Sequence, residues 1–317
     1  MVRSFASAGL FTRTQMAGST SLRSICRTHG VTLQAFQTSQ RHVFYKVATT
    51  DPYLSIASQP ESITTGLAAA LELNAASDGQ RQLREALLGR LKGHVLEVGT
   101  GTGAVAREVA KMEAVQAVTG IDPSPAFLER ARSLGGPKEK YVEAYSTDLS
   151  SAVETASVDH ALMWTTLGHI PEEQHAPTII ELHRVLKPNG VLHILDNDPC
   201  SWDFRMHPHD PLNAPVQAML DSVVQDRFLM RKARALVESN GFVAQPLRIE
   251  TQLDTSAASY GYRHVLLRAI EEFAASGIVG APFIEAMKFE AKRRVRVGEF
   301  QMALSYAYIE ATKAPSK

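Results

Sequence analysis

The sequence predicts an α/β fold in which helices cover both faces of a parallel sheet. Two observations carry this prediction. Short apolar segments at 94–98, 117–121, 159–164 and 191–196 alternate with segments of helical periodicity at 104–112, 124–134 and 172–186. The first apolar segment also runs directly into a glycine-rich turn, as a strand does where a parallel sheet binds a ligand.

The remaining elements follow from local patterns along the chain. A helix is expected at 78–92 after a Ser-Asp start, and the turn at 187–190 (KPNG) ends one helix and begins the next strand. Beyond residue 198 this alternation stops. We expect a lid at 199–225, rich in Pro, His and Asp, and then a helix at 226–240, a strand at 245–254, helices at 260–275 and 281–296, and a last strand at 299–309.

Charge is distributed unevenly along a chain that is neutral overall. The 317 residues contain 33 basic and 33 acidic residues, but the first 50 hold six of the basic residues and none of the acidic ones. Residues 51–317 therefore carry a net charge of −6, which argues against a basic nucleic-acid-binding surface. No uncharged stretch exceeds 13 residues, so no membrane-spanning helix is expected. Two cysteines exclude a disulfide framework.

The acid-free N-terminus has the composition of an organellar transit peptide. It is rich in Arg and Ser and lacks the continuous apolar core of a secretory signal. We expect residues 1–44 to be a disordered transit peptide, cut near Arg41–Phe44, and residues 45–317 to form a single domain. A mitochondrial location is favoured over a plastid. The alternative is a basic tail without a targeting role.

The motif with the most chemical content is VLEVGTGTG at 95–103, which precedes a helix. Glycines at alternate positions allow a tight turn and bring a ligand against bare backbone at the helix N-terminus. The spacing is close to that of dinucleotide-binding turns and does not exclude them. Glu97 argues against a dinucleotide, because a carboxylate at this position would repel a pyrophosphate. It suits a ligand that carries an amino group. No Gly-Lys-Ser/Thr follows, so a Walker phosphate loop is excluded.

Two further acids follow later strands. Asp122, in GIDPSP, ends the next strand 19 residues after Gly103, where a carboxylate can hold ribose hydroxyls; otherwise it caps the following helix. Asp148, in STDL, ends the third unit, where an acid can accept a hydrogen bond from an adenine amino group. Glu97 is either a third ligand-binding acid or a buried charge paired with an arginine. Three acids around a glycine turn suit a cationic adenosine ligand.

With these motifs in order, followed by SVDHALMWTTLGHI and RVLKPNGVLHILD, the segment at 92–198 resembles the class I S-adenosylmethionine-dependent methyltransferases of type 11, related to quinone C-methyltransferases. The resemblance implies a Rossmann-like sheet of seven strands, the last antiparallel, with a helical lid and cap. It implies S-adenosyl-L-methionine as cofactor, with Glu97 near its amino group, Asp122 at the ribose, and Asp148 and Leu149 at the adenine. The candidate cofactor-binding residues are Glu97, Gly99, Thr100, Gly101, Gly103, Asp122, Pro123, Asp148, Leu149 and Trp164, of which Trp164 is either a cofactor contact or a core residue.

The acceptor side is less well defined. His169 follows the fourth strand and is either a general base or a structural histidine. Asp196 and Asp198 end the fifth strand and are expected at the pocket rim. Arg205 and Arg231 border the lid and are candidates for binding a substrate carboxylate, or are ordinary surface residues. The lid at 199–225 and a cap at 255–298 are expected to close over the acceptor.

No metal centre is expected. The segment His207-Pro-His209-Asp210 brings together metal-ligating types, but its residues cannot readily reach one ion, and a solvated lid loop is the better interpretation. The function expected is methyl transfer to a small-molecule acceptor in an organelle. The alternatives are a protein-modifying or respiratory-complex assembly factor, favoured by an open apolar groove, and a non-catalytic cofactor sensor, disfavoured by the intact acids and glycines. The acceptor and the oligomeric state stay open.

Overall fold

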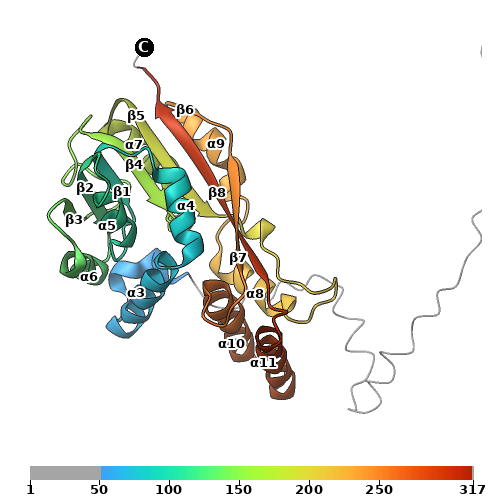
Figure 1. Cartoon of the computed structure of the whole chain (residues 1–317). Helices are drawn as coiled ribbons and strands as arrows, with labels where there is room; N and C mark the ends of the chain where they lie inside the picture. The colour runs from blue at the N-terminus through green and yellow to red at the C-terminus, as the bar shows by residue number, and fades with distance from the viewer. Residues whose placement is uncertain (1–50, 316–317) are drawn as a thin grey trace, which may run out of the picture. The chain divides into compact units, whose positions relative to one another are not determined.

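A central sheet organises the computed structural model, which describes residues 51–315 (Figure 1). Its strand order is β3-β2-β1-β4-β5-β8-β6, with β7 also paired to β8. The expected transit peptide at 1–44 lies outside the described residues. The described residues belong to one compact unit, Lys46–Lys317.

The first five strands are parallel to their neighbours, and the four that the sequence predicted are confirmed. They are β1 (Gly93–Val98), β2 (Val115–Asp122), β3 (Glu139–Glu143), β4 (Val158–Trp164) and β5 (Leu186–Asn197). The sequence did not predict β3. It is an edge strand of sequence EKYVE, in which only Tyr141 is fully buried, so it lacks the apolar run of the central strands.

The antiparallel part of the sheet differs from the predicted seven strands by one. β8 (Met302–Lys313) pairs antiparallel with β5 on one side. On its other side it pairs with β6 (Phe242–Ala244) and then with β7 (Arg248–Asp254), along successive stretches of its length. Pro246 lies in the gap between β6 and β7, and proline cannot donate to a strand ladder. The seventh strand position is therefore occupied by two short strands.

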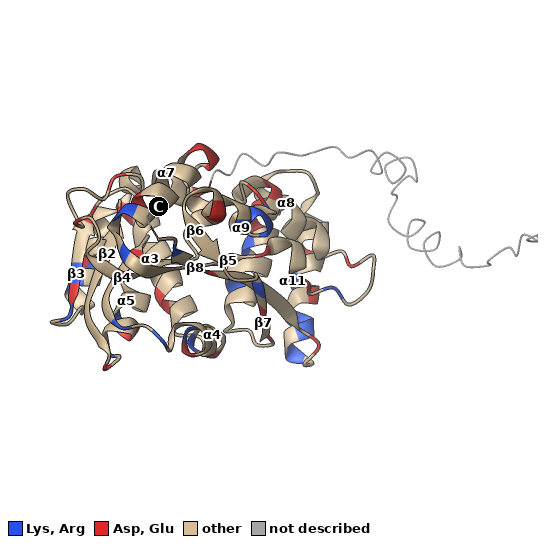
Figure 2. Cartoon of the chain, turned by 90° about the horizontal axis from the view of Figure 1, so that it is seen from above, with Lys and Arg blue, Asp and Glu red and all other residues tan. Residues whose placement is uncertain are grey.

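Helices cover both faces of the sheet, as Figure 2 shows with the sheet seen on edge. One face carries α4 (Asp78–Leu88), α5 (Ala104–Ala110) and α6 (Pro125–Leu134), and the other carries α7 (Glu172–Val185) and α9 (Leu229–Ser239). Each face has its own buried apolar cluster. Burial of these two clusters fixes the sheet as the middle layer, because each helix presents one apolar stripe to it.

A group of helical segments lies at one end of the sheet (Figure 1). They are η2 (Pro52–Ser58), α3 (Glu61–Ala75), α8 (Asn213–Val223), the π-helical turn η5 (Gly261–Leu267), α10 (Arg268–Ala275) and α11 (Ala281–Arg296). The expected lid at 199–225 is thus more than a loop, because it contains η4 (Pro199–Ser201) and α8. Among the described helices, none is both long and apolar enough to cross a membrane.

A buried ion pair fastens the lid to the last helix. Both carboxylate oxygens of Asp210 accept from the guanidinium of Arg294 on α11, at 2.6 and 2.9 Å. The side chains are 0% and 4% exposed. The backbone N–H groups of Met206 and Leu212 donate to the same carboxylate. Asp210 therefore organises the loop as an anchor.

We predict that Arg294→Leu destabilises the protein by about 3 kcal/mol, because it leaves the carboxylate of Asp210 buried without its cation. Urea denaturation measures the change. The matched control is Arg205→Leu, which breaks the solvent-exposed pair with Asp203 and should cost less than about 0.5 kcal/mol. Equal losses of unfolding free energy in the two variants would show that the buried pair stabilises the protein no more than the exposed pair does.

Candidate functional site

The turn between β1 and α5 has the backbone geometry that its glycines predict. Gly99, Gly101 and Gly103 have φ angles of +71°, +54° and +74°, a region that side chains disfavour. A Cβ atom on Gly99 would also lie 2.3 Å from the side chain of Thr166. The turn consequently exposes bare backbone at the carboxyl edge of the sheet.

Glu97 lies beneath this turn and is 2% exposed. Its carboxylate accepts a hydrogen bond of 2.6 Å from the Thr100 hydroxyl. Burial raises the pKa of Glu97 to about 7, although the Thr100 hydrogen bond and the charge of Arg84 act in the opposite direction. Arg84 itself is paired with Glu108, and Glu97 has no salt-bridge partner in the described part of the chain. The alternative that Glu97 is one half of a buried ion pair is therefore wrong.

Asp122 ends β2 beside the same turn and is 6% exposed. Its two oxygens accept from the backbone N–H groups of Gly101 and Ser124, both at 2.9 Å. Burial raises the pKa of Asp122 to about 6 despite these two hydrogen bonds. Helix α6 is capped by the side chain of Ser124, so the alternative role of Asp122 as the helix cap is taken by its neighbour.

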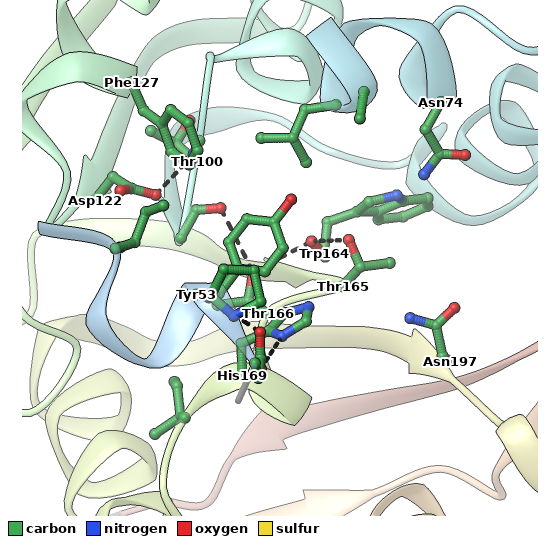
Figure 3. Close-up of a pocket in the computed structure, with 18 of the residues that line it drawn as sticks. Tyr53, Asn74, Thr100, Asp122, Phe127, Trp164, Thr165, Thr166, His169 and Asn197 are labelled. Atoms are coloured by element: carbon green, nitrogen blue, oxygen red, sulfur yellow. Dashed lines mark hydrogen bonds and ion pairs between the residues drawn. The ribbon is translucent and has the colours of Figure 1, made fainter. Parts of the chain in front are cut away.

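A cavity of about 380 Å³ opens over the turn (Figure 3). Its volume is within the range of ~300–1,000 Å³ that is usual for small-molecule sites. The predicted residues that line it are Glu97, Gly99, Thr100, Gly101, Asp122, Pro123, Trp164 and His169. Gly103 shapes the turn without lining the cavity. Trp164 both lines the cavity and donates from its indole N–H to Gln80 at 3.1 Å.

Asp148 and Leu149 do not line the cavity. Asp148 is exposed and accepts from the backbone and hydroxyl of Ser150, which lowers its pKa, while Leu149 is fully buried in the core. The cavity is instead lined by the residues that precede them, at 144–146. The sequence pointed to this loop, but a loop has no periodicity that shows which of its side chains point into the cavity.

Asp196 and Asp198 do not face the cavity either, so the expectation that they form its rim is wrong. Side chains alternate along a strand, and the residue between them, Asn197, is the one that lines the cavity. Asp196 is 3% exposed and accepts from the backbone N–H of Gly168 at 2.9 Å. Asp196 thereby holds the turn on which His169 lies.

The two candidate substrate arginines lie outside the cavity. Arg205 is exposed and makes a bidentate contact with Asp203. Arg231 lies 3.4 Å from Asp198 and over the ring of Phe228. Two other arginines do line the cavity, Arg84 of α4 and Arg268 at the start of α10, and no sequence pattern pointed to either.

The N-terminal segment before α3 supplies cavity residues that no sequence pattern predicted. Asp51 and Tyr53 line the cavity, and Asp51 Oδ2 lies 2.6 Å from His169 Nδ1. Asp51 also caps η2 by accepting from Tyr53 N–H at 3.0 Å, and the Asp-Pro pair at 51–52 was the one local indication of a turn there. No local pattern connects Asp51 to a histidine 118 residues away.

The lid and the cap together contribute an apolar wall. Met219, Leu220 and Val223 of α8 line the cavity from the lid, and Tyr260 and Val265, at the start of η5 and within it, line the cavity from the cap. Within the expected cap at 255–298, the lining residues fall between 260 and 268, and α11 supports the wall from behind. No cluster of three or more metal-ligating side chains occurs among residues 51–315.

Comparison with known proteins adds a family match to this geometry. Residues 95–190 match the family model described as "Methyltransferase domain". Demethylmenaquinone methyltransferase of Chlorobaculum parvum is 29% identical over 160 residues, which are 50% of this chain and 60% of that protein. O-methyltransferase resE of Aspergillus sclerotiorum is 35% identical over 108 residues, 32% of this chain and 39% of that protein. The chain thus spans less than two thirds of these relatives.

Among solved structures, phosphoethanolamine N-methyltransferase 2 of Haemonchus contortus, in complex with phosphomonomethylethanolamine and S-adenosylhomocysteine, is 17% identical with a TM-score of 0.48. The alignment covers 83% of this chain and 60% of that one.

The raised pKa of Glu97 predicts that Glu97→Gln stabilises the unliganded protein at alkaline pH. The folded state keeps a proton that the unfolded chain releases, so the contribution of Glu97 to stability falls as pH rises from 4.5 to about 7. Removing the charge should then stabilise the fold by up to about 3 kcal/mol near pH 8 and by little near pH 5.

Urea denaturation at the two pH values measures this difference. The control is Glu113→Gln, which alters an exposed carboxylate and should leave stability unchanged at both. A loss of stability in Glu97→Gln that is the same at both pH values would contradict the account.

Proposed function

We propose that the protein is an S-adenosylmethionine-dependent methyltransferase that methylates a small organic molecule, because residues 95–190 match the model of a methyltransferase domain. The observation that carries the proposal is the continuity of the cavity. It extends from the glycine turn and Asp122 to the apolar wall of α8 and η5. One continuous space therefore offers a surface for the cofactor and a surface for the acceptor.

The cofactor surface suits a cationic adenosine ligand. Glu97 and Asp122 are buried acids whose pKa values are raised by burial, and neither is neutralised by a basic side chain in the described part of the chain. A ligand with an ammonium and a sulfonium group supplies the missing positive charge. When bound, S-adenosylmethionine would provide an electrophilic methyl group. Glu97 would hold its amino group, Asp122 would hold the ribose, and the bare backbone at 99–101 would lie under it.

The acceptor surface favours a small molecule over a protein. It is built from side chains of η2, α3, α8 and η5 that surround the cavity, with Trp164 and Tyr306 as its floor. Walls on several sides of the cavity align donor with acceptor, which a displacement at a methyl carbon needs more than it needs a nucleophilic side chain. A protein-modifying enzyme or assembly factor would need a long groove for a polypeptide, whereas a cavity of about 380 Å³ has the size of a small-molecule site.

The cofactor assignment predicts a difference between two aspartates. Asp122→Asn should weaken S-adenosylmethionine binding about 10- to 100-fold, because it replaces a charge-assisted hydrogen bond at the ribose. Isothermal titration calorimetry measures the affinity. The matched control is Asp148→Asn, which makes the same chemical change at an exposed position outside the cavity and should bind within about twofold of the native protein.

Equal affinities for native protein and Asp122→Asn would overturn the cofactor site. Weakening in Asp148→Asn alone would show that the adenine lies on the loop at 146–149 as the family resemblance implies, and outside the cavity described above.

We also propose that residues 1–44 direct the protein to the mitochondrion, with a plastid as the alternative. The support is the excess of arginine and serine in a segment without acids. Fused to a fluorescent protein, residues 1–50 should be imported into mitochondria, and replacing Arg3, Arg13, Arg23 and Arg27 by Gln should leave the fusion in the cytosol. Import of the fusion with these four substitutions to the same extent would contradict a charge-driven address.

A further inference from the structure

We propose that Asp51 and His169 act as a general-base pair, and that the methyl acceptor is a phenol or enol whose hydroxyl oxygen is methylated. The inference rests on the proposed methyl transfer and specifies its acceptor. It depends on a pair of side chains from two segments far apart in the chain that meet at the wall of the cavity. Figure 3 labels His169 of this pair and the neighbouring Tyr53.

The geometry of the pair is that of an oriented base. His169 ends the 3₁₀ turn η3 (Leu167–His169), which follows β4. Its Nδ1 lies 2.6 Å from Oδ2 of Asp51, whose side chain is 3% exposed, whereas the His169 side chain is 34% exposed. A carboxylate partner fixes Nδ1 as the protonated nitrogen. Nε2 then carries the lone pair, and it has no hydrogen-bond partner among residues 51–315.

The imidazole is held from several sides. The backbone N–H of Gly168 donates to Asp196 at 2.9 Å, and that of His169 donates to Thr166 at 3.0 Å, so the turn cannot easily rotate. The ring of Tyr53 lies against the imidazole with a centroid distance of 4.5 Å. Asp196 is thus a positioning residue for His169, although it does not reach the cavity.

The charges around His169 favour its accepting a proton. Burial alone lowers the pKa of His169, but the hydrogen bond and charge of Asp51, aided by Asp196, raise it above the ordinary value. The groups that face the ring are Asp51 and Tyr53 from the N-terminal segment and Asp196 from β5. Both carboxylates stabilise an imidazolium, which is what a base becomes when it works.

The reaction balances without any further reagent. Nε2 of His169 takes the hydroxyl proton, and the oxygen electron pair forms the new bond to the methyl carbon supplied by S-adenosylmethionine. The carbon–sulfur bond breaks, its electron pair stays on sulfur, and S-adenosylhomocysteine leaves. His169 then releases the proton to solvent. A thioether acceptor has no proton to lose, so a general base would not contribute to its methylation.

The neighbouring wall fits a flat acceptor. Trp164, Tyr260 and Tyr306 line the cavity along with Tyr53, and aromatic side chains pack well against a planar ring. A phenol or enol combines such a flat body with a hydroxyl acidic enough for an imidazole to deprotonate. A simple alcohol is a much weaker acid and would gain little from this base.

4-Nitrophenol tests the pair without requiring turnover, because its phenolate absorbs at a longer wavelength than the phenol. The full chain is saturated with S-adenosylhomocysteine at a pH about one unit below the pKa of the free probe. The native protein should raise the phenolate fraction of bound probe at least about threefold. Both Asp51→Asn and His169→Gln should remove most of this increase. The control Asp203→Asn, an exposed carboxylate outside the cavity, should keep it.

Calorimetry with S-adenosylhomocysteine separates the possible failures. If the native chain does not bind it, the proposed function is overturned. If it binds, but the native protein shows no phenolate enrichment for any reason, the base pair is overturned and the cofactor site stands. Enrichment that survives in Asp51→Asn and is lost in His169→Gln removes Asp51 from the proposal. Should Asp51→Asn fail to fold, Asp51→Glu replaces it. This variant misaligns the pair, so it should lose as much of the phenolate enrichment as His169→Gln does.

Discussion

The hydrogen bond from the Gly101 N–H to the Asp122 carboxylate joins the ends of β1 and β2, and the rest of the site is arranged around it. It requires a backbone at positive φ, which only the glycine run at 99–103 supplies readily. It also holds a carboxylate in a place where burial raises its pKa. With Glu97 beneath the same turn, the fold keeps two acids that are poorly stabilised on their own and better stabilised by a cationic ligand.

The proposed acceptor side combines His169 and Trp164, which lie within the matched residues 95–190, with segments that lie outside them. Residues 51–58 bring Asp51 and Tyr53 to the cavity from before β1, and residues 260–268 reach it from beyond β7. These segments meet over a turn that belongs to residues 95–190. Under the proposed function, the glycine turn that would hold the methyl donor belongs to the matched domain, and part of the acceptor surface comes from segments outside it. A match confined to the common fold cannot identify the acceptor.

The sequence predicted correctly those features that depend only on residues near one another in the chain. The apolar strands, the glycine turn, Glu97 and Asp122 were all found, because each depends on periodicity or on a position next to a strand end. The predictions failed where a shift of one residue along a strand or loop, or a contact between distant segments, determines which side chain lines the cavity. Asn197 lines the cavity where Asp196 and Asp198 were expected, and the loop at 144–146 replaces Asp148. The contact of Asp51 with His169 spans 118 residues and has no local trace.

We propose that one cavity brings a methyl donor to a small acceptor. The most direct test is to incubate the protein with two components: S-adenosylmethionine that carries deuterium in its methyl group, and an extract of organellar metabolites and proteins. The label is then followed by mass spectrometry. The account predicts that label enters a compound of the low-mass fraction and that Asp122→Asn reduces this transfer. Label found in the protein fraction alone would contradict it and would favour a protein-modifying enzyme.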